Sequence, residues 1–289
     1  MEVNEILKKV RKIEIKTKHL SNDLLMGDYS TAFKGRGMSF SEVREYSYGD
    51  DVRHIDWNVT ARTNYPHIKV YEEEREMTMM FLVDCSKSAI WGTSQQLKNE
   101  YITELCAVLA FSAVGNDDKV GAILFTEKIE LYIPPSKGRK QILRIIREII
   151  NIDEPQPGTN IKGALQYFHS IQKKKATCFL ISDFIDEDYT NAFRIVRKKH
   201  DLICMQVHDK GEVELPDVGI IEVFDQETGE KSILDTSDKK VQNAYYKNFE
   251  KKQEELKNIC RQSKIDLVTL FTDEDYVKPL MEFFKKRTQ

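Results

Sequence analysis

Short apolar runs alternate with helical patterns over most of the chain, and this alternation restricts the possible folds more than any other feature. Brevity and polar flanks mark six runs as buried strands: 78–84, 119–125, 128–134, 176–182, 201–207 and 264–271. Helical patterns cover 97–114, follow Gly138 and Asn160, cover about 190–198, begin near Ser237, and end near Lys286. A hairpin is expected around Thr228 and Gly229. The alternation predicts an α/β fold: a mostly parallel sheet with helices on both faces.

The chain has two parts that differ in pattern, and its 289 residues suit one large domain with an appendage. The strand and helix alternation begins at about Thr78, and no repeat or linker-like tract divides the chain. We therefore expect an N-terminal segment, residues 1–76, of helical and irregular structure, packed on an α/β domain of residues 77–289. Within that segment, residues 3–20 have an amphipathic pattern, which predicts a helix that packs on the neighbouring domain.

Charge and hydropathy narrow the possible partners and locations. The formal net charge of −3 gives no global attraction to nucleic acid or to an anionic membrane, so neither is expected as a partner. No apolar run reaches the roughly 18 residues needed to span a bilayer, and the start MEVNEILKKVRK is charged where a signal peptide is apolar. These features predict a cytoplasmic protein. Its five isolated cysteines are expected to be reduced core residues.

Oxygen-bearing side chains follow the ends of two predicted strands and precede one predicted helix. Asp84, Ser86 and Ser88 come directly after the first strand, Asp183 follows strand 176–182, and Thr159 precedes a helix. In an open parallel sheet, ligands bind at the carboxyl ends of the strands, where these groups can converge. Carboxylate and hydroxyl oxygens without histidine or thiolate suit a hard cation such as Mg²⁺ or Mn²⁺. The alternative is local: the serines cap the turn and Asp84 bonds nearby amides.

These five positions resemble the metal-ion-dependent adhesion site of the von Willebrand factor A domain. That site has the pattern Asp-x-Ser-x-Ser followed by a distant Thr and a distant Asp, matched here by Asp84, Ser86, Ser88, Thr159 and Asp183. The resemblance implies that the serines, and usually the threonine, bind the metal directly while the aspartates act through water. It also implies that a partner protein's acidic side chain fills the open coordination position.

The segment before the first strand carries a second resemblance, to the bacterial family called domain of unknown function fifty-eight. The matching residues are Arg44, Tyr46, Gly49, Asp50, Arg53, Ile55, Asp56, Trp57, Ala61 and Arg62. In that family this signature precedes a von Willebrand A-like domain. The resemblance implies a companion of a MoxR-type AAA-plus ATPase, which links the ATPase to a client protein or to the assembly of a complex.

The chemistry of the signature also suggests what its charges do. Arg44, Arg53 and Arg62 carry planar forks that match carboxylates as bidentate partners, and Asp50, Asp51 and Asp56 supply those carboxylates. We expect a structural ion-pair network, with Trp57 anchoring this segment to the core. The alternative is a direct binding surface.

Known catalytic patterns fit this chain poorly. The segment 158–163 has the glycine spacing of a phosphate-binding loop, but Ala164 and Leu165 replace the required Lys and Ser/Thr. An Mg²⁺-dependent phosphohydrolase using Asp84 and Asp183 remains the alternative function, although Ser86 stands where such enzymes favour a second acid. The sequence therefore predicts a non-enzymatic, metal-dependent protein interaction module.

Overall fold

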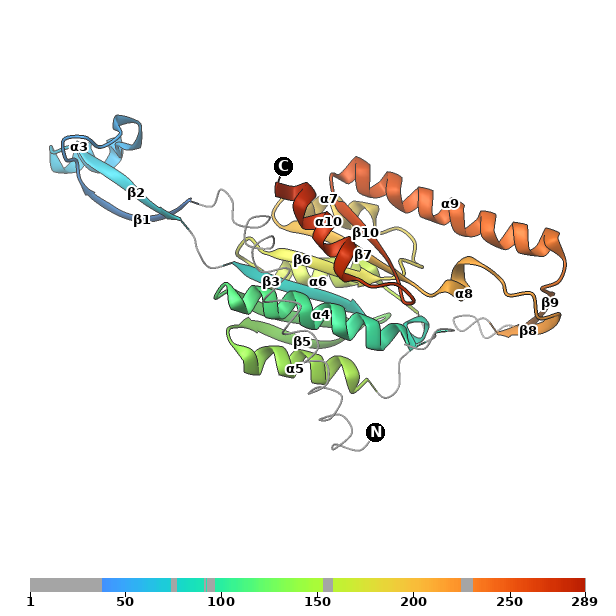
Figure 1. Ribbon diagram of the computed structural model, residues 1–289. Helices are drawn as coiled ribbons and strands as arrows, with labels where there is room; N and C mark the ends of the chain where they lie inside the picture. The colour runs from blue at the N-terminus through green and yellow to red at the C-terminus, as the bar shows by residue number, and fades with distance from the viewer. Residues whose placement is uncertain are drawn as a thin grey trace.

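A six-stranded sheet forms the centre of the molecule (Figure 1). The computed structural model describes residues 38–73, 77–90, 92, 97–152, 158–224 and 231–288. The sheet order is β10-β7-β6-β3-β4-β5, parallel throughout except that β5 runs antiparallel to β4. Its strands are β3 (Thr78–Asp84), β4 (Lys119–Phe125), β5 (Ile129–Ser136), β6 (Thr177–Ser182), β7 (Asp201–His208) and β10 (Asp266–Phe271). The predicted α/β fold is confirmed, and all six predicted strands are present.

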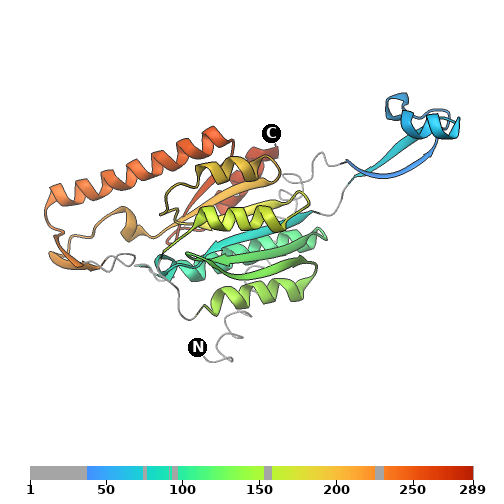
Figure 2. The ribbon, with the colours of Figure 1, turned by 180° about the vertical axis from the view of Figure 1, so that it is seen from behind.

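Helices cover both faces of the sheet, as Figures 1 and 2 show from opposite sides. On one face lie α4 (Lys98–Gly115), α5 (Arg139–Ile150) and α10 (Val277–Thr288). On the other lie α6 (Ile161–Ile171), α7 (Thr190–Arg197) and α9 (Lys239–Ser263). Alternate side chains of β3 enter the two cores, because successive residues of a strand point to opposite faces. This double cover explains why β3 is apolar throughout rather than alternating.

Shorter elements lie beyond the carboxyl ends of the strands. A 3-10 turn, η3 (Lys87–Ile90), follows β3, and α8 (Lys210–Val213) follows β7. The strands β8 (Ile220–Phe224) and β9 (Lys231–Asp235) pair antiparallel, as the hairpin prediction requires. The predicted turn residues Thr228 and Gly229 lie outside the described residues.

The described part of the N-terminal segment is a small β-hairpin with a helix at its end. It comprises β1 (Met38–Glu45), η2 (Val52–His54), α3 (Trp57–Thr63) and β2 (His67–Glu73), with β1 and β2 antiparallel. The two strands were not predicted, and in Figures 1 and 2 the unit stands away from the six-stranded sheet instead of packing on it. Of the apolar side chains of this unit whose burial is described, only Ile68 is buried, so the unit has little core of its own. The boundary at residue 76 remains a prediction, and both it and the predicted helix 3–20 lie outside the described residues.

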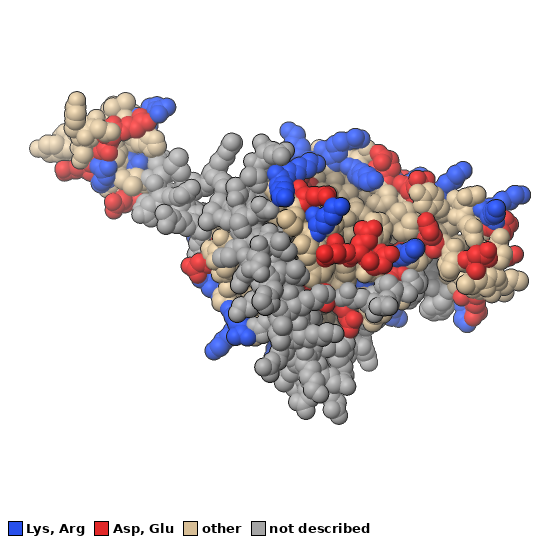
Figure 3. All heavy atoms as spheres, viewed as in Figure 1, with Lys and Arg blue, Asp and Glu red and all other residues tan. Residues whose placement is uncertain are grey.

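The charges of the signature pair in part as predicted. Both Arg44 terminal nitrogens donate to Asp50 at 2.8 Å, and Arg53 pairs with Asp51 at 2.6 Å. Asp56 instead accepts hydrogen bonds from the first backbone amides of α3 and pairs with Lys69 at 3.5 Å. These are separate local pairs rather than one buried network, because Asp56 is the only buried residue among them. Figure 3 shows red and blue groups side by side on this unit.

The expected role of Trp57 as a core anchor was wrong. Trp57, the first residue of α3, is 70% exposed. The cysteine prediction fits the structure: all five are free thiols and all are buried. None of the helices within the described ranges is both long and apolar enough to cross a bilayer.

Candidate metal site

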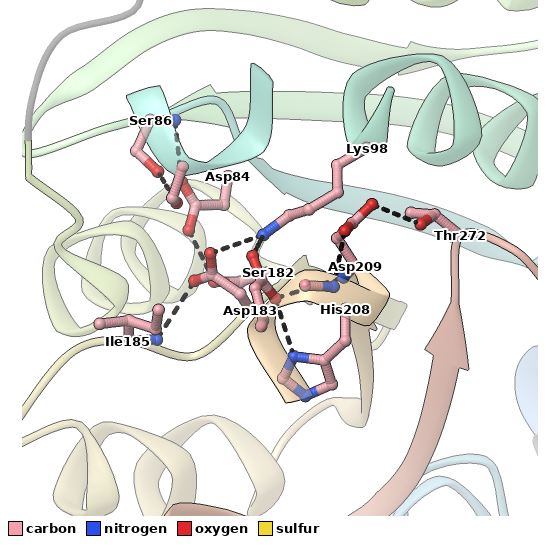
Figure 4. A network of polar contacts seen from close by, with 12 residues as sticks. Asp84, Ser86, Lys98, Ser182, Asp183, Ile185, His208, Asp209 and Thr272 are labelled. Atoms are coloured by element: carbon pink, nitrogen blue, oxygen red, sulfur yellow. Dashed lines mark hydrogen bonds and ion pairs between the residues drawn. The ribbon is translucent and has the colours of Figure 1, made fainter. Parts of the chain in front are cut away.

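The candidate site lies where β3 and β6 end, side by side in the centre of the sheet. Asp84 is the last residue of β3 and is 3% exposed. Ser182, the last residue of β6, donates to Asp84 Oδ2 at 2.6 Å, and the Ser86 amide donates to Asp84 Oδ1 at 3.0 Å (Figure 4). One carboxylate oxygen is therefore held by the neighbouring strand β6 and the other by the turn after β3, which holds Asp84 in one orientation.

Ser86 and Ser88 come together in the turn that follows β3. Their hydroxyl oxygens are 3.0 Å apart, and Ser86 is buried. The turn continues as the 3-10 helix η3, so the two side chains meet through a tight turn and not through extended backbone. The Ser88 hydroxyl also bonds to Asp183, which joins the β3 turn to the end of β6.

Thr159 reaches the site from the loop before α6. Its hydroxyl lies 3.3 Å from Asp84 Oδ2. The adjacent Asn160 fixes the loop in two ways: its side chain caps α6 by accepting from the Gly163 amide, and its own amide donates to the Thr126 carbonyl. Gly158 has a φ of +84°, a conformation that residues with a Cβ rarely adopt. The glycine and the cap together direct Thr159 toward Asp84.

Asp183 begins a strained turn directly after β6. Asp183 Oδ1 accepts from the Ile185 amide at 3.2 Å, and the Ser182 hydroxyl accepts from the Phe184 amide at 3.0 Å. Between them Phe184 adopts a φ of 61°, which is uncommon for a bulky residue. Such strain gathers at functional sites, where the surrounding contacts maintain it.

A buried lysine completes the surroundings of Asp183. Lys98, the first residue of α4, is 1% exposed and donates to Asp183 Oδ2 at 3.0 Å and to Glu212 Oε1 at 2.6 Å. Burial alone would raise the pKa of Asp183, but the Lys98 charge and hydrogen bonds outweigh burial and lower it. Burial and the nearby Asp183 charge raise the pKa of Asp84 to about 6. The two carboxylates therefore have different environments despite their proximity.

The donor set fits a hard cation. In near-octahedral coordination with metal–oxygen distances of about 2.0–2.1 Å, neighbouring ligand oxygens lie about 3 Å apart. The separation of the Ser86 and Ser88 hydroxyls, 3.0 Å, matches such an edge. Asp84, which accepts from the Ser86 amide, also lies 3.3 Å from the Thr159 hydroxyl. Among the described residues no three His, Cys, Asp or Glu side chains gather as a metal site. Three of the five donors proposed here are hydroxyls instead.

All five predicted residues are joined by hydrogen bonds, and the structure adds several that the sequence analysis missed. The most important are Lys98, Ser182 and Glu212. Ser182 had a usable signal, because it ends a predicted strand next to Asp183. Lys98 and Glu212 had none: each is a charged residue near a helix start, and their meeting across 114 residues follows only from the tertiary fold.

Solved structures and relatives match this chain over most of its length. BatB, a conserved hypothetical protein from Bacteroides thetaiotaomicron, superposes with a TM-score of 0.50 at 16% identity, over 73% of this chain and 98% of BatB. An aerotolerance-related membrane protein from Bacteroides fragilis gives 0.48 at 15% identity, with the same coverage. The VWA domain of SpRpn10 gives 0.40 at 11% identity, over 72% of this chain and 94% of that domain. At 16% identity the likeness to BatB concerns the fold alone.

Sequence comparison identifies the family. An uncharacterized protein of Mycobacterium bovis is 27% identical over 286 residues, covering 96% of this chain and 88% of the relative. An uncharacterized protein of Mycobacterium tuberculosis matches with the same identity and coverage. The family model described as "Protein of unknown function DUF58" matches residues 42–255, which include the signature and all five candidate site residues. The chain belongs to the DUF58 family.

Proposed function

We propose that this protein is a non-enzymatic, metal-dependent module. It would bind other proteins at the carboxyl ends of its parallel strands, called the carboxyl edge of the sheet below. One observation carries the proposal: three hydroxyls and two carboxylates from the ends of β3 and β6 and the loop before α6 form one hydrogen-bonded cluster, in which the Ser86 and Ser88 hydroxyls are 3.0 Å apart. Ser86, Ser88 and Thr159 would hold Mg²⁺ or Mn²⁺, with Asp84 and Asp183 in support. The bound cation would offer an open coordination position to an acidic side chain.

The same arrangement favours binding over hydrolysis. A phosphohydrolase of this topology needs an acid near Asp84 to protonate the leaving group, and Ser86 cannot serve as a carboxylate acid. Lys98 neutralises Asp183 and so opposes its use as a general base. We therefore expect no metal-dependent turnover of a generic phosphoester.

The proposed partner is a MoxR-type AAA-plus ATPase or its client protein, which supplies the Glu or Asp that completes the metal shell. The support for this partner is the family resemblance of the signature between Arg44 and Arg62. In this role the protein is an adaptor or assembly factor.

Metal binding is tested by calorimetric titration of Mg²⁺ and Mn²⁺ into the wild type and the double variant Ser86→Ala/Ser88→Ala. The double variant should lose binding, because it removes two hydroxyl donors at once. Ser112→Ala is the matched control: it removes a buried hydroxyl of α4 that bonds to the Val108 carbonyl. At 1.5 Å per residue, Ser112 is about 20 Å along α4 from Lys98. Equal binding in the double variant and the wild type would refute the metal site.

Partner binding is tested with the purified ATPase in a biosensor titration with and without EDTA. Binding should weaken on chelation and in Asp84→Ala, while circular dichroism stays unchanged. If the ATPase binds equally well in every condition, the metal does not mediate this contact. Metal-dependent phosphoester turnover that disappears in Asp84→Asn would instead favour the hydrolase.

A further inference from the structure

Lys98 places a permanent positive charge beside the proposed cation site. Lysine is rarely buried fully unless it is paired, and here the ammonium group bridges two carboxylates from different elements. Asp183 follows β6, and Glu212 belongs to α8. Figure 4 shows the Lys98 nitrogen pointing between the strand ends, close to Asp183 and on the side away from Ser86.

The position of Glu212 is fixed by its own helix. Glu212 Oε2 accepts from the Asp209 amide at 3.3 Å, one half of a capping box at the start of α8. The same oxygen lies 3.1 Å from His208 Nδ1. Since Glu212 is held by this backbone contact and Asp183 by the Ile185 amide, Lys98 is confined between two fixed acceptors.

The negative charge of Asp183 interacts with two groups at once. Asp183 presents one oxygen to Lys98 and receives the Ser88 hydroxyl, so it faces both the ammonium group and the proposed metal donors. A divalent cation held by Ser86 and Ser88 would therefore share Asp183 with a monovalent cation already in place. Two cations on one carboxylate repel each other, and low local dielectric strengthens that repulsion.

We propose that Lys98 is a resident cation that weakens divalent metal binding at this site, so that the metal is held tightly only when an acidic partner adds its negative charge. The inference rests on the proposed function and adds its regulation. Lys98 is a positioning residue, because it acts through Asp183 and not through the metal. Glu212 offsets part of the Lys98 charge and thereby moderates its effect.

Two variants should change metal affinity in opposite directions. Lys98→Met removes the ammonium group and keeps an unbranched side chain, so Mn²⁺ should bind at least about tenfold tighter. Glu212→Gln leaves the Lys98 charge less compensated, so Mn²⁺ should bind several-fold more weakly. A merely structural role for this cluster would weaken binding in both variants, because both disturb the same contacts.

The experiment is a calorimetric Mn²⁺ titration of the full chain, together with the shift in Tm that Mn²⁺ produces in each variant. Lys137→Met is the matched control. Lys137 pairs with Asp117 near the amino end of β4, and the loss of this pair should leave the Mn²⁺ affinity within about twofold of wild type. Mn²⁺ should raise the Tm of Lys98→Met more than that of the wild type, since the cation then replaces a missing charge.

The outcomes separate this inference from the proposed function. Mn²⁺ binding to the wild type that disappears in Ser86→Ala/Ser88→Ala, with unchanged or weaker binding in folded Lys98→Met, overturns the role of Lys98 alone. If Lys98→Met does not fold, Lys98→Gln decides, because it also removes the charge but keeps a side chain that can donate a hydrogen bond: unchanged or weaker Mn²⁺ binding there overturns the inference. No Mn²⁺ binding in the wild type or in either variant overturns both proposals.

Discussion

Acid–base pairs of similar length occur in two regions of this molecule, and their surroundings differ completely. At the carboxyl edge of the sheet, the Lys98–Asp183 pair is 3.0 Å long and its side chains are 1% and 2% exposed. On the N-terminal hairpin unit, the Arg53–Asp51 pair is 2.6 Å long and its side chains are 84% and 41% exposed. The shorter contact is the one in water.

Burial, rather than distance, therefore ranks these interactions. In water both members of a pair are solvated when separated, so an exposed pair typically contributes about 0–1 kcal/mol. In the core, removal of one member of a pair leaves the other as a buried charge that is neither solvated nor paired. Removal of one charge from an ion pair should therefore lower the free energy of unfolding strongly in the buried region and only slightly in the exposed one.

The largest expected effect is the loss of the buried pair. Lys98→Met, measured by urea unfolding without divalent metal, should lower the free energy of unfolding by about 3–5 kcal/mol, because Asp183 and Glu212 lose their shared counter-charge. Lys137→Met, which breaks an exposed pair with Asp117, should cost less than about 1 kcal/mol. Equal losses of unfolding free energy in the two variants would show that burial does not determine how much these ion pairs stabilise the protein.

A buried titratable group without an ion-pair partner sharpens the comparison. His200 is 1% exposed, and neither of its ring nitrogens has a hydrogen-bond partner among the described residues. Burial first, then the charges of Lys199 and His169, lower the pKa of His200 from 6.5 to about 4. Between these two pH values the unfolded chain binds a proton that the native protein does not.

Stability should therefore be fully present above about pH 6.5 and fall as the pH drops toward 4, by an amount on the order of 2–3 kcal/mol from this group. His200→Leu removes the titrating group without breaking a described hydrogen bond, so its urea midpoint should fall less between pH 7 and pH 4.5. An identical pH dependence in the variant and the wild type would contradict a neutral buried His200.

A neutral hydrogen bond to a buried charge should rank next. Ser182→Ala removes the hydroxyl that donates to Asp84 and accepts from the Phe184 amide, at an expected cost of about 1–3 kcal/mol. Ser170→Ala is the exposed counterpart, because its hydroxyl bonds to the Tyr167 carbonyl on the surface of α6, and it should cost less than about 0.5 kcal/mol. Thermal or urea unfolding of both variants tests the ranking; a larger loss in Ser170→Ala would reverse it.

The same contrast explains what the sequence could predict. The strands of the sheet were predictable because burial on both faces leaves a continuous apolar run, as in β3. Their polar ends were predictable for a related reason: Asp84 and Asp183 interrupt such runs abruptly. The convergence of both with Thr159 then followed from the geometry of a parallel sheet, with the von Willebrand A resemblance to support it.

Contacts that depend on tertiary placement were beyond the sequence. Nothing local indicates that Lys98 is buried, since lysine at the start of a helix is usually solvated. On the hairpin unit the error was the reverse: Trp57 and the signature charges suggested burial because their residue types often occur in cores and networks. Without an apolar run beside them, there was no core to receive them.

The smallest expected changes in stability are those of substitutions on the hairpin unit. They test whether the signature between Arg44 and Arg62 is structural or a binding surface. Arg53→Ala and Arg44→Ala each remove an exposed partner, so each should leave the Tm close to that of the wild type, with any difference reduced further in 1 M salt. Trp57→Ala should also leave the Tm of the α/β domain close to wild type, because the indole is 70% exposed. Calorimetric melting of the three variants gives these Tm values.

A large loss of stability in Arg53→Ala would support the buried ion-pair network that was expected from the sequence. Near-wild-type melting combined with weaker binding of the ATPase would show instead that the exposed signature is an interface, separate from the metal site.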